Sequence, residues 1–203
     1  MSRFISFPAY PDSMPIDLSF VFQDEKPAGR RGFLTVQKDR FVFEDGTPVR
    51  FWGVNFNGGA CFPEFADSEK VARRLAQSGC NLVRFHQLDA EWNTPNLFCF
   101  RKGERIGHTR TLHPESLKRL DYLVFCLKRE GIYVYLDMLT YRNFKSGDGV
   151  ENPYELQDAA DPYNYYNRRL IDLQKEFMVQ IWTHHNPYTG LAYKDDPVFV
   201  LTE

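Results

Sequence analysis

The sequence predicts an α/β fold with a parallel sheet, because short apolar runs alternate with segments of helical periodicity. The apolar runs are nearly continuous, which is typical of strands covered by helices on both faces of a sheet. Each is followed by a segment long enough for the helical crossover that parallel neighbours need. We therefore expect four neighbouring parallel strands in chain order, at Val49–Val54, Asn81–Phe85, Ile132–Leu136 and Val198–Leu201.

The first helix is expected between the first two of these strands. Asp67 can accept a hydrogen bond from a free amide at a helix start, so we expect this residue to cap the helix. Val71, Leu75 and Ala76 follow at helical spacing. Gly79 then ends the helix, because glycine readily adopts the left-handed conformation found after a last helical turn.

Two more helices are expected by the same signals. Pro114 occupies the place of a first helical residue, and Gly131 ends that helix directly before the third strand. Asp161 and Pro162 are expected to open the third helix. Its apolar stripe comprises Leu170, Leu173, Phe177 and Ile181.

The residues before the first core strand differ in composition from the rest. Residues 1–32 contain four prolines and no clear period, and they predict an extended leader. Phe33–Val36 and Arg40–Glu44 predict a small hairpin, with the turn Asp45–Gly46 following it. We expect residues 33–203 to form one domain, since 43% hydrophobic residues suffice for a single core.

Composition excludes several classes of function. A net charge of -2 and a pI near 6.2 predict no nucleic-acid or anionic-membrane partner. No apolar run approaches the ~20 residues of a membrane span, and the first residues lack the apolar core of a signal peptide, so we expect a cytoplasmic protein. No metal or other cofactor is expected, because the four cysteines lack metal-type spacing and fit reduced, buried thiols: Cys61, Cys80, Cys99 and Cys126.

Loop lengths indicate which edge of the sheet carries function. Segments 86–113 and 139–161 follow the second and third strands, whereas the connections at Gly79 and Gly131 are minimal. Both long segments leave the carboxyl ends of strands, where parallel α/β proteins bind ligands. The connection 183–197 at the other edge is also long and weakens this asymmetry. The basic cluster 101–110 fits a solvated surface.

Seven polar and aromatic residues fall at or just beyond these strand ends. Alternation along a strand places Arg84 and His86 on one side. Arginine can keep a carboxylate ionised, histidine and asparagine can hydrogen-bond sugar hydroxyls, and tryptophan and tyrosine offer flat faces with polar tips. Each residue also has a structural alternative, and Asp137 in particular could brace the loop after it. The candidate ligand-binding residues are Asn55, Arg84, His86, Asp89, Trp92, Asp137 and Tyr141.

Four segments resemble the amino-terminal half of clan A glycoside hydrolases, particularly the cellulase-like family 5 group. The resemblance covers about residues 33–203. It implies strands one to four of a (β/α)8 TIM barrel, preceded by a short hairpin that could plug its amino-terminal end. The segments are KDRFVFEDGTPVRFWGVNF, NLVRFHQLDAEW, LDYLVFCLKREGIYVYLDMLTYR and WTHHNPYTGLAYKDDPVFVLTE.

The resemblance implies retaining hydrolysis of β-glycosidic bonds by two glutamates, one after strand four and one after strand seven, ~5–5.5 Å apart. Arg84 matches the family's arginine beside the nucleophile, and His86 and Asp89 match polar positions bordering the sugar. The family's acid/base glutamate follows asparagine, whereas Thr202 precedes Glu203 here. Glu203 therefore matches the strand glutamate ahead of the catalytic one. Both catalytic glutamates are expected outside this partial glycoside hydrolase.

Two alternatives remain open. One is a non-catalytic half-barrel that binds an oligo- or polysaccharide, as a homodimer or with a missing carboxyl-terminal half. Its first and last strands would be open edges, which normally need a partner. The other is a metal-dependent hydrolase using His86, Asp89 and Asp137, which the lack of paired histidines at a strand end disfavours.

Overall fold

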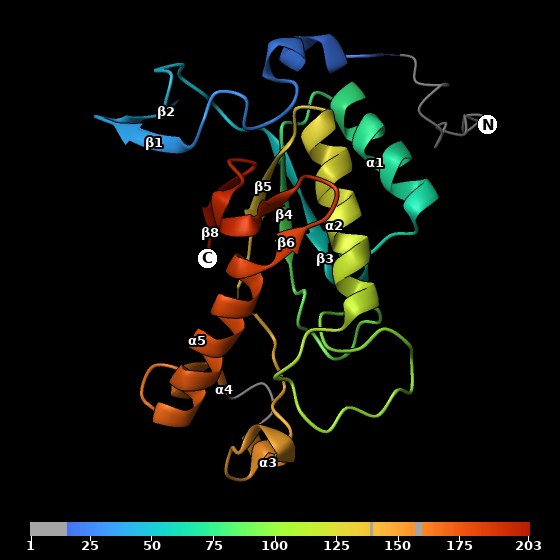
Figure 1. Ribbon diagram of the computed structural model, residues 1–203, viewed down its shortest axis with the longest axis vertical. Coiled ribbons are helices and arrows are strands. Elements are labelled where there is room, and N and C mark those ends of the chain that lie inside the picture. Colours follow the sequence, from blue (N-terminus) through green and yellow to red (C-terminus); the bar gives the residue numbers. More distant parts are fainter. Residues whose placement is uncertain (1–15, 139, 157–159) are drawn as a thin grey trace, which may run out of the picture.

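A four-stranded parallel sheet forms the centre of the computed structural model, which describes residues 16–138, 140–156 and 160–203 (Figure 1). The strands are neighbours in chain order, so the predicted order and direction are confirmed. In their register Asn55 lies opposite Arg84, and Arg84 lies opposite Tyr135. The strands are β3 (Gly53–Asn57), β4 (Leu82–His86), β5 (Tyr133–Leu136) and β8 (Phe199–Thr202).

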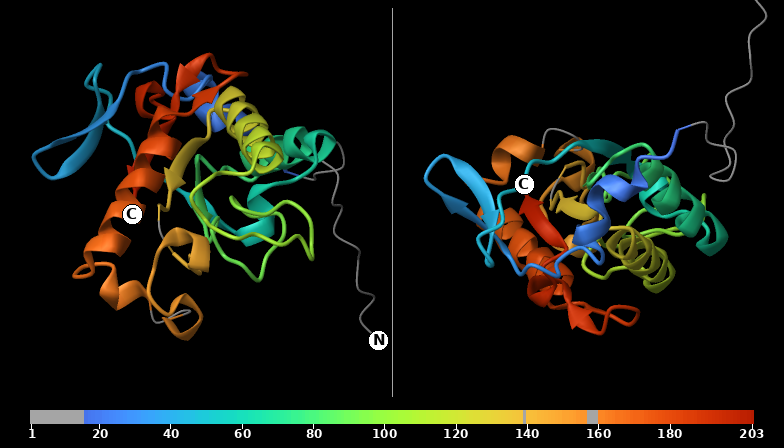
Figure 2. Two further views of the ribbon diagram at one scale, coloured as in Figure 1. Left: turned by 60° about the horizontal axis from the view of Figure 1, so that its bottom comes forward. Right: turned by 90° about the horizontal axis from the view of Figure 1, so that it is seen from above.

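Three longer helices accompany this sheet, namely α1 (Phe65–Gln77), α2 (Pro114–Arg129) and α5 (Arg168–Thr183). α1 and α2 lie side by side, while α5 lies farther from α1, on the side of β8 (Figure 2). Trp182 of α5 contacts Phe199 of β8 with ring centroids 5.9 Å apart. The buried core between sheet and helices includes Val83, Phe85, Val134, Leu136, Leu120, Leu123, Leu127 and Phe177.

The first core strand begins later than the sequence predicted. β3 starts at Gly53 instead of Val49 and runs through Asn57, so Asn55 lies inside the strand. The backbone N–H of Val49 donates to Phe41 in the hairpin, and that of Trp52 donates to the side-chain oxygen of Asn81. These tertiary hydrogen bonds take the donors that a longer strand would have used.

The first two helices differ in how they begin. α1 starts at Phe65 after Glu64, so the prediction that Asp67 caps it was wrong. Asp67 lies in the first turn and pairs with Lys70 at 3.2 Å. α2 begins at Pro114 as predicted, and the His113 ring before it accepts the N–H of Glu115 at 3.3 Å.

The third helix is divided in two. Asp161 and Pro162 lie in the one-turn helix α4 (Ala160–Tyr163), which follows a similar turn, α3 (Pro153–Leu156). The chain then turns, and Asn167 accepts the N–H of Leu170 at 3.2 Å to cap α5. The predicted apolar stripe of α5 is buried, as expected.

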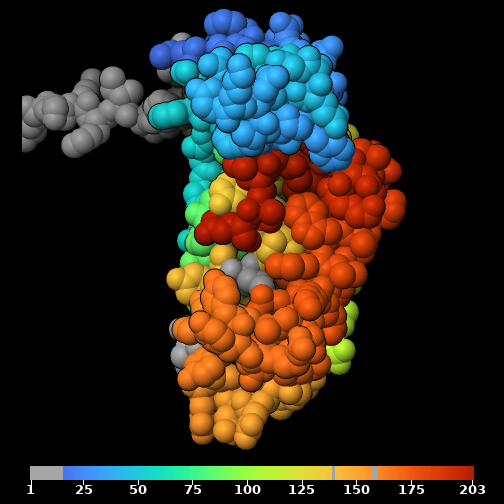
Figure 3. All heavy atoms as spheres, turned by 90° about the vertical axis from the view of Figure 1, so that its left-hand side faces the viewer, coloured from blue at the N-terminus to red at the C-terminus, as the bar shows by residue number. Residues whose placement is uncertain are grey.

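The predicted hairpin is present as the antiparallel pair β1 (Leu34–Gln37) and β2 (Arg40–Phe43). Phe43 stacks on Tyr133 at the start of β5, with ring centroids 5.1 Å apart. This contact places the hairpin at the amino-terminal end of the sheet. Figure 3 shows it at the opposite end of the molecule from α3. Three more short elements follow α5: β6 (His185–Asn186), β7 (Leu191–Ala192) and the 3₁₀ helix η6 (Tyr193–Asp195).

The leader is only partly within the described residues, since residues 1–15 lie outside them. Its remaining part is not extended throughout, because it contains the 3₁₀ helix η2 (Ser19–Glu25). The N–H of Ala28 donates to the carbonyl of Lys128 at 2.8 Å. Lys26 pairs with Glu130 at 2.7 Å. These bonds hold residues 26–28 against the carboxyl end of α2.

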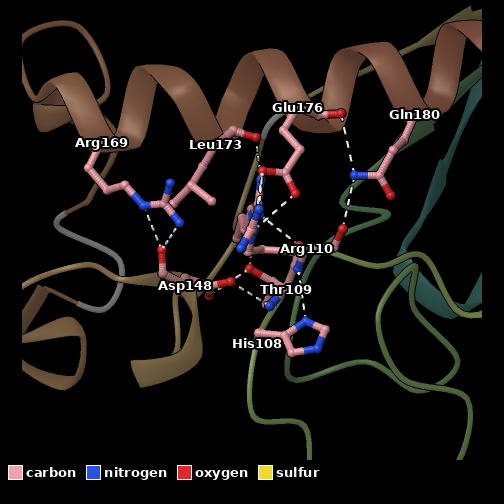
Figure 4. A network of polar contacts seen from close by, with 9 residues as sticks. His108, Thr109, Arg110, Asp148, Arg169, Leu173, Glu176 and Gln180 are labelled. Atoms are coloured by element: carbon pink, nitrogen blue, oxygen red, sulfur yellow. Dashed lines mark hydrogen bonds and ion pairs between the residues drawn. The ribbon is translucent and has the colours of Figure 1, made fainter.

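Arg142 joins the two long loops to α5 through Thr109 and Leu173, both of which are labelled in Figure 4. This side chain is 5% exposed; it donates to Thr109 Oγ1 at 2.9 Å, to the Thr109 carbonyl at 2.7 Å and to the Leu173 carbonyl at 3.1 Å. Burial lowers its pKa to about 10, so Arg142 stays charged at neutral pH. Its guanidinium lies 5.0 to 5.6 Å from the ring centroids of Phe98, Phe144 and Phe177.

Asp148, at the end of the 3₁₀ helix η4 (Ser146–Asp148), completes this network. It is fully buried and accepts hydrogen bonds from Thr109 N at 2.7 Å, Thr109 Oγ1 at 2.9 Å and Lys145 N at 2.7 Å. Arg110 nearby pairs with Glu176 of α5 at 3.0 Å. One end of the basic cluster 101–110 is therefore bound to the fold and is not simply a solvated surface.

We predict that Asp148→Asn lowers the free energy of unfolding by about 2–3 kcal/mol, because an amide group would face buried donors that need an acceptor. The measurement is chemical denaturation followed by circular dichroism. Asp39→Asn, the same change at an exposed residue of the hairpin, should shift the value by less than about 0.5 kcal/mol. Equal effects of the two substitutions would show that Asp148 does not hold the loops.

Candidate functional site

Asp137, directly after β5, is the centre of a group of charged and polar side chains at the strand ends, called the charged group below, which also includes Arg84, His86 and Glu203. The Asp137 side chain is 1% exposed, accepts a hydrogen bond from Arg84 Nε at 3.1 Å and forms an ion pair with Arg84 Nη2 at 3.0 Å. His86 Nδ1 contacts the same carboxylate. Burying a carboxylate without hydrogen-bond donors is unfavourable, and these contacts offset the cost of burying the Asp137 charge. They also confirm that Arg84 and His86 share one side of β4.

Glu203 extends this charged group to the fourth strand. Its Oε2 accepts a hydrogen bond from Tyr135 at 2.7 Å and from Arg84 Nη2 at 2.8 Å. The Tyr135 hydrogen bond, followed by the positive charge of Arg84, lowers the pKa of Glu203 below its ordinary value. The same hydrogen bond raises the pKa of Tyr135. Glu203 is therefore ionised at neutral pH, and Arg84 lies between two carboxylates.

Asn55 lies on the open part of the sheet beside this group. It is exposed, and its side chain makes no hydrogen bond with any residue that the structure describes. Its backbone is opposite Arg84 in the register of β3 and β4. Asn55 is therefore placed next to the charged group with its amide available to a ligand.

The position of Asp89 after β4 suggested a side chain that faces a ligand, whereas in the structure this side chain is buried. Its buried carboxylate accepts hydrogen bonds from Thr140 Oγ1 at 2.7 Å, Thr140 N at 3.0 Å and Tyr141 N at 3.1 Å. These bonds tie the loop after β5 to the loop after β4. Asp89 thus positions Tyr141, and its carboxylate oxygens are already occupied.

Trp92 and Tyr141 form an aromatic pair beside Asp89. Their ring centroids are 4.5 Å apart in an edge-to-face arrangement. Trp92 remains 55% exposed after this contact. The pair offers a fixed apolar surface of the kind that packs against a sugar ring.

The structure therefore divides six of the seven predicted site residues into two groups, and Asn55 lies beside the first of them. Arg84, His86 and Asp137 meet in the charged group, whereas Asp89, Trp92 and Tyr141 form the aromatic group. Sequence reasoning missed Tyr135, although its place two residues before Asp137 puts both on the same side of β5. That alternation is the signal that could have found it.

The described residues contain no group of three or more His, Cys, Asp or Glu side chains arranged to hold a metal ion. His86 and Asp137 are in contact, but Asp89 is engaged with the loop. In the same part of the chain, no helix has both the length and the apolar character needed to cross a lipid bilayer. Cys61, Cys80, Cys99 and Cys126 are buried and unpaired, as predicted.

When the chain is compared with known proteins, the similarity found is in three-dimensional structure and not in sequence. No protein-family model matches the sequence, and no curated protein matches it. The endo-1,4-β-mannanase from Rhizomucor miehei superposes with a TM-score of 0.63 at 18% identity, covering 85% of this chain and 47% of that one. A glycoside hydrolase family 5 mannosidase from the same organism gives 0.60 at 17% identity, covering 85% and 49%.

A third similar structure is the hyperthermostable endo-1,4-β-D-mannanase from Thermotoga petrophila, with a TM-score of 0.51 at 19% identity, covering 76% of this chain and 44% of that one. The chain spans about half the length of the solved structures it matches. The expected resemblance to family 5 structures is thus confirmed at the level of fold. The chain therefore has an α/β fold that matches about half of the TIM barrel of those solved structures.

Proposed function

We propose that this chain supplies the sugar-binding first half of a barrel that hydrolyses β-glycosidic bonds with retention. The observation that carries the proposal is the charged group at the strand ends, where Arg84 of β4 contacts both Asp137 and Glu203. Carboxyl ends of barrel strands are where enzymes of this fold place their chemistry. The likeness to family 5 structures supports the same reading.

Arg84 is held in a way that suits support of a carboxylate nucleophile. A hydrogen bond from Nε and an ion pair from Nη2 to buried Asp137 orient the guanidinium plane, while 31% of the side chain stays exposed. A fixed positive charge beside the nucleophile keeps that carboxylate ionised and stabilises it as the leaving group in the second step. We assign Arg84 as a positioning residue for the reaction.

Neither carboxylate of the charged group suits the role of general acid. A general acid needs a raised pKa so that it carries a proton near neutral pH. The pKa of Glu203 is lowered, and Asp137 is buried against Arg84 and His86. We therefore propose that the general acid comes from outside residues 1–203, which agrees with threonine preceding Glu203. The nucleophile is proposed to come from there as well, since the resemblance to family 5 places it after strand seven.

The proposed substrate is a β-linked oligo- or polysaccharide. Two of the similar structures are named as endo-1,4-β-mannanases and one as a mannosidase, so β-1,4-linked mannose is the first sugar to test. Asn55, His86 and the Trp92–Tyr141 pair supply the polar and apolar contacts that sugar recognition needs. We place the protein in the cytoplasm on its four unpaired cysteines, since a reducing compartment keeps thiols in this state.

A second candidate function is carbohydrate binding without hydrolysis, by this half-barrel as a homodimer or with a separate second half. One observation favours it. The Asp137 carboxylate already has Arg84 and His86 as partners, so the charged group needs no further residue from a second half of the barrel. The open edges of β3 and β8 would then be paired by the partner. Hydrolysis assays and oligomeric state separate the two functions.

We predict that the 203-residue chain does not hydrolyse aryl β-mannosides, because retaining cleavage needs two carboxylates in acid and nucleophile roles. Product release is followed by absorbance, with a commercial β-mannosidase as positive control. Turnover by the purified chain that disappears in Glu203→Gln would assign the acid/base role to Glu203 and contradict the proposal.

We predict that Arg84→Lys weakens binding of β-1,4-mannobiose about tenfold, since lysine keeps the charge near Asp137 but loses the two-point geometry. Binding is measured by isothermal titration calorimetry. Arg110→Lys, which alters a similar pair with Glu176 away from the strand ends, should leave the affinity unchanged. Unchanged affinity in Arg84→Lys together with a lower melting temperature would show that Arg84 is purely structural.

A further inference from the structure

A cleft of about 480 Å³ lies in the loop that follows β4, apart from the charged group. Its walls include Glu91, Trp92, Asn93, Asn96, Lys102 and Glu104. We propose that this cleft, called the loop cleft below, binds a further sugar residue of the polysaccharide whose first residues occupy the strand ends. The inference rests on the proposed function and extends it to longer substrates.

The walls of the loop cleft are fixed by side-chain hydrogen bonds to the backbone. Asn96 donates to the carbonyls of Ala90 and Asn93 at 3.2 and 2.8 Å, and its oxygen accepts two backbone N–H groups at 2.8 Å. Glu104 accepts the N–H groups of Phe100 and Arg101, both at 3.2 Å. A cleft that is already ordered loses little conformational entropy when a ligand binds.

Two polar side chains in the loop cleft have no partner within the described chain. The Asn93 amide and the Lys102 ammonium make no hydrogen bond or ion pair with any residue the structure describes. Asn93 rests on Gly58, where any side chain would come within 2.2 Å of its amide nitrogen. An amide that both donates and accepts, held in place beside an exposed indole ring, suits a sugar hydroxyl.

The charges of the loop cleft favour a neutral ligand. Glu91 is paired with Lys145 at 2.6 Å, and Glu104 lies 3.6 Å from the His113 ring, so Lys102 is a positive charge on walls that also carry two carboxylates. The lining therefore has no excess of positive charge for a phosphate or a carboxylate ligand. Exposed aromatic surface together with hydrogen-bonding groups of both kinds matches a pyranose ring, which has an apolar face and a rim of hydroxyls.

Trp92 connects the loop cleft to the strand ends. Its ring lines the cleft and also packs on Tyr141, whose N–H is held by Asp89. The loops that carry these residues are further joined by a bridge between Ala90 and Arg142. A β-linked chain that packs on the Trp92–Tyr141 pair would therefore extend along Trp92 into the loop cleft.

The test compares binding of β-1,4-mannobiose and β-1,4-mannohexaose to the 203-residue chain by isothermal titration calorimetry. We expect the hexaose to bind about tenfold more tightly than the biose. Trp92→Ala, which also removes an aromatic contact of the strand-end site, should weaken binding of both sugars and abolish that difference. Asn93→Ala combined with Lys102→Ala should reduce the difference while keeping the Trp92–Tyr141 pair intact. Trp52→Ala removes a tryptophan that is 69% exposed just before β3 and should leave both affinities unchanged.

The outcomes separate the loop cleft from the proposed function. Suppose that the biose binds and that Arg84→Lys weakens its binding. If the hexaose then binds no more tightly than the biose, or still binds more tightly in both loop-cleft variants, the loop-cleft proposal is overturned and the proposed function stands. If the unaltered chain binds neither sugar, the proposed function fails and the loop cleft fails with it. Loss of the hexaose advantage in the variants, with unchanged melting temperatures, supports the loop cleft.

Discussion

The burial of the Asp137 carboxylate is the constraint on which the candidate site depends. A carboxylate that is 1% exposed needs donors, and β4 supplies them through Arg84 and His86. The guanidinium that satisfies Asp137 also reaches Glu203 after β8. One buried charge thus links the ends of three parallel strands and sets the direction in which Arg84 points.

Buried polar groups organise the long loops in the same way. The Thr109 hydroxyl donates a hydrogen bond to the Asp148 carboxylate and accepts one from the Arg142 guanidinium. Asp89 similarly holds the backbone next to Tyr141. The aromatic pair and the loop cleft are therefore presented by loops tied to the fold, which is how a scaffold positions groups for binding.

The starts of β3 and α1 deviated from the sequence-based prediction because distant residues took part in them. The start of β3 depends on Asn81, whose side chain accepts the N–H of Trp52. The start of α1 lies at Phe65, whose ring packs on Tyr122 of α2 with centroids 4.9 Å apart. Only the break before α5 had a local signal, because Asn167 is a favourable cap that the apolar period conceals.

The sequence by itself determined the alternation of strands and helices, the order of the parallel strands and the placement of Arg84 and His86 on one side. These features follow from periodicity and short connections, which are local properties of the chain. Only the tertiary structure decided that Asp89 braces a loop, that Glu203 pairs with Arg84 and that the loop cleft exists. Those contacts join residues far apart in sequence, and their partners are selected by packing and by the need to satisfy buried charge, which no local pattern encodes.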